Sequence, residues 1–381
     1  MMRRIKRICL LLILIVLSAA CNLPRPEKSA TLVPSEIPPT FTLIPTQEIT
    51  LTLAPKNTPL SPSLRNYAES RRLHLGTYIM WNAMNDPAWK EIAGREFDMA
   101  QSFDGFNWAE LEPEQGKFNF SVVDQQVDFA LSQNMQVCAN TLFWPSYEAV
   151  YPEWVLNGNY SKSEMSALIQ NYITTVVTHY QGKITCWIAV EEPYNPPERD
   201  WDLLHATFGD YTYIDLAYQT VRETDPDALL IYNDCDNITA SDVNTALTYQ
   251  IIDRMSQEGI VDAVGMCMHL DASDPPDQQD VTETMKSYGV PVHITEILVN
   301  LADLPGTQQE RYGVQADIYA SMLNACLESG VCDSYSVWGF GDDYSYTEYY
   351  DLDSDSTIYD ANLVPKPAYD ALLKTLQSDS N

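Results

Sequence analysis

From residue 67 onward, short apolar runs alternate with longer segments in which apolar residues recur every three or four positions. Short apolar runs are typical of buried strands, and the longer period is typical of helices that bury one face. The expected strands are residues 73–80, 97–103, 135–143, 183–190, 228–234, 261–269, 290–297 and 333–340.

Two of the intervening segments show the helical period clearly. In residues 210–224, Asp210 can cap the N-terminus, because an aspartate side chain accepts hydrogen bonds from the free N–H groups of a first turn. One face of this segment is apolar and consists of Ile214, Ala217, Tyr218 and Val221. Residues 307–328 keep a similar period with Tyr312, Tyr319, Leu323 and Leu327.

Strands that alternate with helices predict an α/β fold, in which helices cover a parallel sheet. Eight such repeats are the number that a (β/α)8 TIM barrel needs, so we expect residues 67–377 to form one barrel domain. Active sites in this fold lie at the carboxyl ends of the strands, and polar residues there are the first candidates for chemistry.

The segment before the barrel differs in composition. Residues 1–20 place basic residues before an apolar run and small residues, the pattern of a secretion signal too short to span a membrane. The ending LSAAC resembles a lipoprotein signal, which makes Cys21 the expected lipidation site. Residues 21–66 are rich in Pro, Thr and Ser and predict an extended tether. We therefore expect a bacterial protein at the cell surface or outside the cell, with a lipid anchor as its one membrane contact.

The chain is strongly acidic, with 53 acidic and 22 basic residues and a formal net charge of −31. This charge repels phosphate backbones, so nucleic acid is not an expected partner. A neutral ligand is electrostatically easier to bind, and we expect the chain to act as a monomer.

Two of the expected strands end in glutamate. The stretch CWIAVEEPYN places Glu191 and Glu192 after the fourth strand, and Glu296 ends the seventh. Adjacent carboxylates usually mark a solvated loop edge, but charged ends of apolar barrel strands are poorly explained by stability alone. Two carboxyl groups that flank a sugar bond are the equipment of glycoside hydrolysis, in which one is protonated and the other ionised.

Seven segments resemble, in order, the sequence patterns of glycoside hydrolase family 10, the endo-β-1,4-xylanases. They lie within residues 73–373 and include FDMAQSFDGFNWAELEPEQGKFNF, CWIAVEEP, DALLIYND, VDAVGMCMHL, VPVHITEILV, SVWGFGDDYSY and IYDANLVPKPAYDALL. The resemblance implies a barrel that hydrolyses a polysaccharide, β-1,4-xylan, with retention of configuration. It implies no cofactor and no metal.

In this resemblance Glu192 takes the place of the general acid/base, and Glu296 takes that of the nucleophile. Because a residue before proline favours an extended backbone, Pro193 predicts that Glu192 continues its strand. Glu191 replaces an asparagine that hydrogen-bonds the sugar 2-hydroxyl in the family. Its carboxyl can accept such a bond, repel Glu192, or face solvent.

Several sugar-binding positions of the family are changed. A lysine is replaced by Asn107, a histidine by Asn140 and a tryptophan by Tyr346. A site built for particular hydroxyls loses discrimination when its partners change, which puts the substrate in question. The aromatic rings can stack on sugars or belong to the core, and His269 can orient Glu296 or be a core histidine. With Glu191, the expected substrate-binding residues are Asp104, Asn107, Asn140, Trp144, His269, Trp338 and Tyr346.

Six cysteines follow the leader. Cys326 and Cys332 are close enough in sequence for a disulfide in an exported domain. Cys267 and His269 form a pair without further partners, which favours a buried thiol and a hydrogen-bonded histidine over a metal site. The acidic run at residues 351–356 lacks the glycine and distal glutamate of a calcium loop and predicts a solvated loop.

Two alternatives to xylan hydrolysis remain open. The changed sugar-binding positions are compatible with a relative that cleaves another β-glycan. The other alternative is a cell-surface glycan-binding protein that has lost turnover, although a pure binder has no need of both glutamates.

Overall fold

The computed structural model describes residues 63–102, 105–193, 202–344 and 355–378. Within these residues eight parallel strands form a closed barrel, in which each strand pairs with the next and β8 pairs with β1. This is a (β/α)8 TIM barrel, as expected, and each expected strand has a counterpart in it. The strands are β1 (His74–Ile79), β2 (Met99–Ser102), β3 (Gln136–Phe143), β4 (Cys186–Val190), β5 (Leu229–Cys235), β6 (Ala263–Asp271), β7 (Val292–Asn300) and β8 (Cys332–Val337).

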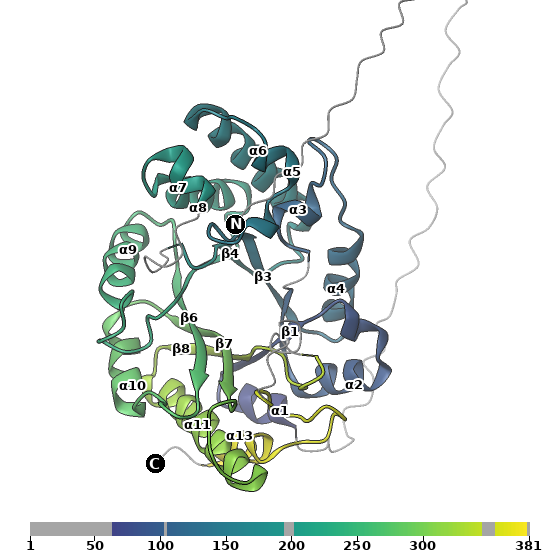
Figure 1. Ribbon diagram of the computed structural model, residues 1–381, viewed down its shortest axis with the longest axis vertical. Helices are drawn as coiled ribbons and strands as arrows, with labels where there is room; N and C mark the ends of the chain where they lie inside the picture. The colour runs from purple at the N-terminus through teal and green to yellow at the C-terminus, as the bar shows by residue number, and fades with distance from the viewer. Residues whose placement is uncertain (1–62, 103–104, 194–201, 345–354, 379–381) are drawn as a thin grey trace, which may run out of the picture. The chain divides into compact units, whose positions relative to one another are not determined.

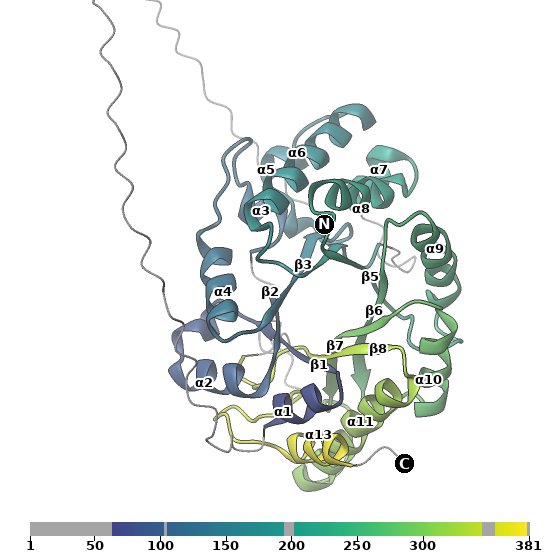
Figure 2. The same cartoon turned by 180° about the vertical axis from the view of Figure 1, so that it is seen from behind.

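Helices surround the strands, as Figures 1 and 2 show from opposite sides. Helices α1 and α13, from the two ends of the described barrel, pack against each other beside α11. No helix in the described ranges is long and apolar enough to cross a membrane. The helices are α1 (Leu64–Ser70), α2 (Pro87–Glu96), α3 (Trp108–Leu111), α4 (Ser121–Ser132), α5 (Glu153–Leu156), α6 (Lys162–Tyr180), α7 (Leu203–Phe208), α8 (Thr212–Thr224), α9 (Thr245–Gln257), α10 (Gln278–Ser287), α11 (Gln308–Ser329) and α13 (Pro367–Gln377).

The expected helix at 210–224 begins slightly later than its apolar pattern suggested. Tyr211 occupies the N-cap of α8, so the prediction that Asp210 is the cap is wrong by one position. The Asp210 carboxylate nevertheless accepts a hydrogen bond of 3.1 Å from the backbone N–H of Thr212, the first helical residue. Helix α11 begins after Thr307, whose side chain forms a reciprocal capping box with Glu310.

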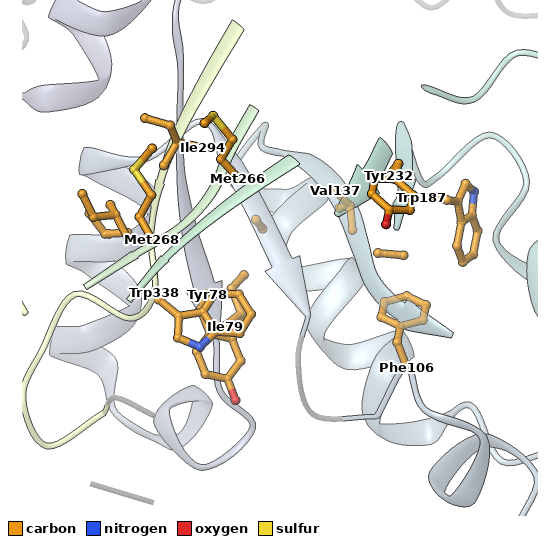
Figure 3. Packing of buried hydrophobic residues seen from close by; sticks show 14 of the residues in the cluster. Tyr78, Ile79, Phe106, Val137, Trp187, Tyr232, Met266, Met268, Ile294 and Trp338 are labelled. Carbon is orange, nitrogen blue, oxygen red and sulfur yellow. The ribbon is translucent and has the colours of Figure 1, made fainter. Parts of the chain in front are cut away.

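Apolar side chains fill both the space under the helices and the barrel interior. The larger cluster joins strands to helices, and Figure 3 shows part of it around Tyr78, Trp187 and Trp338. A separate cluster draws its residues from strands and from no helix, which places it inside the barrel. It consists of Met99, Cys138, Cys186, Ile188, Ile231 and Ala263.

Three disulfides cross-link the barrel. Cys326–Cys332 joins the end of α11 to β8, as the sequence suggested. Cys138–Cys186 joins β3 to β4. Cys235–Cys267 joins register partners on β5 and β6, so the expectation of a free buried thiol at Cys267 is wrong.

The acidic run at 351–356 is described only at its end. There Ser356 is fully buried, and the backbone oxygen of Asp355 accepts a hydrogen bond of 2.7 Å from Nζ of Lys366. Lys366 also pairs with both oxygens of Asp342 at 3.0 Å. The expectation of a solvated loop is therefore wrong for this end of the run, because the buried Lys366 binds both Asp355 and Asp342, which follows β8.

Candidate active site

The prediction that Glu296 ends its strand is wrong, because β7 continues to Asn300. Side chains from two other strands hold Glu296 in place. Only 4% of its surface is exposed. Nδ2 of Asn140, on β3, donates to Oε1 at 3.1 Å, and Nε2 of His269, on β6, lies 3.0 Å from Oε2. Because both oxygens have a partner, the carboxylate has one fixed orientation.

Glu192 lies just beyond the end of β4, and its backbone turns away from the strand. Its φ is +41°, in the left-handed region, so the prediction that Pro193 keeps it extended is wrong. A non-glycine residue in that region costs about 1–3 kcal/mol and persists only where its surroundings hold it there. Here Nε1 of Trp144 donates to Oε2 at 3.2 Å, and the side chain is aimed into the site.

The Cys235–Cys267 disulfide lies against both carboxyl groups. Sγ of Cys235 is 3.1 Å from Oε1 of Glu192, and Sγ of Cys267 is 3.5 Å from Oε2 of Glu296. A disulfide sulfur carries no proton to donate, so these are packing contacts and not hydrogen bonds. The disulfide thus forms a non-donating surface that both glutamates share.

Glu191 is buried and is part of a hydrogen-bonded chain. Nδ2 of Asn233 donates to its Oε1 at 2.6 Å, and Oδ1 of Asn233 accepts from the Thr295 hydroxyl, also at 2.6 Å. The Thr295 hydroxyl donates to the amide oxygen, and the amide nitrogen faces Glu191. Of the three alternatives for Glu191, a solvent-facing carboxyl is excluded, since the residue is only 5% exposed.

The surroundings of Glu191 favour its neutral form. Burial raises its pKa well above the usual value, and the nearby carboxylates of Glu296 and Glu192 raise it further. Oε2 has no hydrogen-bond partner among the described residues. A protonated Oε2 is therefore a buried O–H donor near Glu296.

The structure places two of the other expected substrate-binding residues, Trp338 and Asn107, in structural roles. Trp338 is 2% exposed and its ring stacks on Tyr78 at 4.8 Å between centroids, which makes it a core residue (Figure 3). Asn107 caps α3, where its side chain accepts from the backbone of Glu110 at 3.0 Å. Asp104, Tyr346 and Cys21 lie outside the described residues.

Asn233, Thr295 and Cys235 belong to the site although the sequence did not single them out. A usable signal was present for Asn233, because it lies near the carboxyl end of an expected strand, as Glu192 and Glu296 do. Cys235 could not be paired in advance, since its partner depends on the register of β5 against β6.

One carboxyl group just beyond β4 and a second within β7 both contact the Cys235–Cys267 disulfide, and the second is held at both oxygens. On a TIM barrel this arrangement defines a glycoside hydrolase. Residues 63–375 match glycosyl hydrolase family 10, and the chain belongs to that family.

Known relatives agree with this assignment. The chain is 28% identical over 325 residues to endo-1,4-beta-xylanase B of Thermotoga neapolitana, covering 82% of this chain and 91% of the relative. It is 29% identical to endo-1,4-beta-xylanase A of Phanerodontia chrysosporium, with 79% and 74% covered. Among solved structures, xylanase 10B of Thermotoga petrophila RKU-1 in complex with xylobiose superposes with a TM-score of 0.77 at 27% identity, covering 84% of this chain and 99% of that one. The protein is therefore a glycoside hydrolase similar to endo-1,4-beta-xylanases.

Proposed function

We propose that the chain hydrolyses β-1,4-xylan or a closely related plant β-glycan by double displacement. This proposal rests on one observation. Asn140 and His269 hold the two oxygens of Glu296, and the disulfide that contacts Glu296 also contacts Glu192. The names of the relatives, all endo-1,4-beta-xylanases, support the substrate class.

In the first step an oxygen of Glu296 attacks the anomeric carbon. The carboxyl of Glu192 gives its proton to the glycosidic oxygen as the bond to the leaving sugar breaks. The hydrogen bonds from Asn140 and His269 hold the attacking carboxylate, so little reorganisation is needed at the moment of reaction. A covalent glycosyl-enzyme results.

In the second step Glu192 acts as a base. It takes a proton from water, which attacks the anomeric carbon from the face that the leaving group vacated. Glu296 departs with its bonding electrons, and two inversions give net retention. The neutral Oε2–H of Glu191 donates to a hydroxyl of the sugar bound next to Glu296. No metal or cofactor takes part in these steps.

A different β-glycan is the second candidate for the substrate. Trp338 is buried against Tyr78 and offers no open ring face, and Asn140 stands where xylanases of the family carry a histidine. A pocket with changed polar groups recognises different hydroxyls. This candidate keeps the same two glutamates and the same mechanism.

The chain's location is part of the proposal. We infer that residues 1–20 direct export and that Cys21 is acylated, so the barrel works outside the cell as a tethered monomer. Three disulfides support an oxidising compartment. Partition of the full chain into bacterial membranes, lost in Cys21→Ser, tests the anchor.

Release of reducing sugar from a panel of β-glycans tests the activity, with Glu296→Ala as the matched variant. We expect release from xylan that disappears in Glu296→Ala. Release from another glycan alone would replace the substrate and keep the mechanism. A folded chain that binds a glycan and releases nothing would overturn the proposal in favour of a glycan-binding protein.

A further inference from the structure

Two overlapping groups of potential metal ligands lie where the disulfide meets Glu192 and Glu296. One ligand atom from each of Glu192, Cys235 and Cys267 lies within 4.8 Å of the others. The same limit joins Cys267 to His269 and Glu296. The two groups share Cys267, so one sulfur atom belongs both to a group with Glu192 and to a group with His269 and Glu296.

In the oxidised chain this set is incomplete as a metal site. The sulfurs of Cys235 and Cys267 are bonded to each other, and a disulfide sulfur is a far poorer ligand than a thiolate. Reduction changes that. A dithiol attacks the protein disulfide and is itself oxidised to a cyclic disulfide, which leaves the protein. The two cysteines gain its two electrons and two protons and become thiols.

We propose that, after reduction of Cys235–Cys267, this cluster binds a thiophilic divalent cation such as Zn²⁺ or Cd²⁺ in the catalytic centre. The metal forms two bonds to sulfur, releases the two thiol protons, and completes its shell with His269 and a glutamate oxygen. Two thiolates, an imidazole and a carboxylate are a donor set that Zn²⁺ accepts in tetrahedral sites. The strongly acidic chain attracts cations to the pocket.

The position of the cluster makes it reachable from solvent. Cys235 is half-buried, and the His269 side chain is 32% exposed, so a small reductant and a metal ion have access. The other interstrand disulfide differs, because Cys138 and Cys186 are both buried in the apolar barrel interior. Within the described residues, neither remaining disulfide belongs to a group of three or more potential ligands.

The consequence for catalysis rests on the proposed function. A metal bound to Glu192 or Glu296 removes a carboxyl that the double displacement needs. Reduction in the presence of metal therefore turns the hydrolase off, and chelation followed by reoxidation restores it. Metal binding itself can be measured without any substrate, so the two proposals can fail separately.

The test is a Cd²⁺ titration of the full chain, reduced with dithiothreitol and freed of it by anaerobic gel filtration. The ultraviolet absorption of cadmium–thiolate bonds reports binding, and near-ultraviolet circular dichroism reports the fold. We expect one tight equivalent in the reduced chain and none in the oxidised chain. His269→Ala should keep the absorption and weaken the affinity at least about tenfold.

Two cysteine-pair variants locate the site. Cys326→Ala/Cys332→Ala should keep the tight equivalent, whereas Cys235→Ala/Cys267→Ala should lose it. Equal tight binding by the reduced Cys235→Ala/Cys267→Ala variant would overturn the proposal. So would a reduced wild-type chain that exposes its thiols to a thiol reagent and either binds no Cd²⁺ tightly or has lost its native fold.

Discussion

Nδ2 of Asn233 donates a hydrogen bond of 2.6 Å to Oε1 of Glu191, and this contact determines which oxygen of the buried carboxyl can carry the proton. Oε1 is an acceptor, so the proton of the neutral acid resides on Oε2. An amide in the same place would also present one acceptor and one donor. Neutral Glu191 can therefore present the same acceptor and donor as the asparagine that the family resemblance implies at this position.

Substitutions of Glu191 test its neutral form. Glu191→Gln keeps a carbonyl oxygen for Asn233 and an N–H donor in place of the O–H, so kcat/KM should stay within about tenfold of wild type. Glu191→Ala removes the donor and should lower kcat/KM about a hundredfold, the usual effect of losing one donor to the transition state. Steady-state kinetics on the hydrolysed glycan measure both. A Gln variant as weak as the Ala variant would show that the ionised carboxylate is required.

The same carboxyl should make stability fall as pH rises. Its pKa is raised by burial, so the folded chain keeps a proton that the unfolded chain loses above about pH 4.3. The contribution of Glu191 is complete below that pH and decreases until the folded pKa is passed. Urea unfolding at several pH values should therefore show Glu191→Gln gaining stability relative to wild type above about pH 4.3. A constant difference between the two would contradict the assignment.

His293 should act in the opposite direction. Burial lowers its pKa to about 4, Nδ1 contacts the Ser334 hydroxyl at 2.8 Å, and Nε2 has no partner in the described part of the chain. The unfolded chain takes up a proton below about pH 6.5 and the folded chain does not, so stability is lost as pH falls from about 6.5 towards 4. The loss amounts to about 3 kcal/mol at most. His293→Gln should flatten this acid limb in urea unfolding, and an unchanged limb would exclude His293 as its source.

The absence of a side chain at Gly265 leaves room for the Asn233 amide that binds Glu191. A Cβ added at Gly265 would lie 2.1 Å from Oδ1 of Asn233 and 2.9 Å from Cγ2 of Thr295. Gly265→Ala should displace the amide and lower kcat/KM at least about tenfold, because small misplacements in a catalytic centre have large effects. Gly313→Ala is the matched control, since nothing lies within 4 Å of its added Cβ on α11. That variant should keep full activity; comparable losses in both would refute the specific role of Gly265.

The sequence was sufficient to predict the barrel and the convergence of Glu192 and Glu296, which contact the same disulfide, because both depend on local patterns. Apolar runs define the strands, and the carboxyl ends of barrel strands meet on one face. What the sequence could not provide was contact between strands. The disulfide of Cys235 with Cys267 and the chain from Thr295 through Asn233 to Glu191 depend on register, which short apolar runs do not encode.

Glu192 and Trp338 show a second limit. Pro193 favours an extended neighbour, yet the contact with Trp144 accompanies a left-handed backbone at Glu192, where tertiary structure overrides the local preference. An aromatic residue after a strand can line a pocket or fill the core. Trp338 stacks on Tyr78, a residue from the opposite end of the chain, which no local pattern could indicate.

The most direct test of the account is to trap the glycosyl-enzyme. A 2-deoxy-2-fluoro glycoside with a good leaving group, built on the sugar that the glycan panel identifies, slows the second step more than the first. Mass spectrometry of the intact chain and its peptides should then show one added glycosyl group on the peptide that contains Glu296, and none in Glu296→Ala. A label on another residue, or turnover of the substrate with no adduct, would contradict Glu296 as the nucleophile.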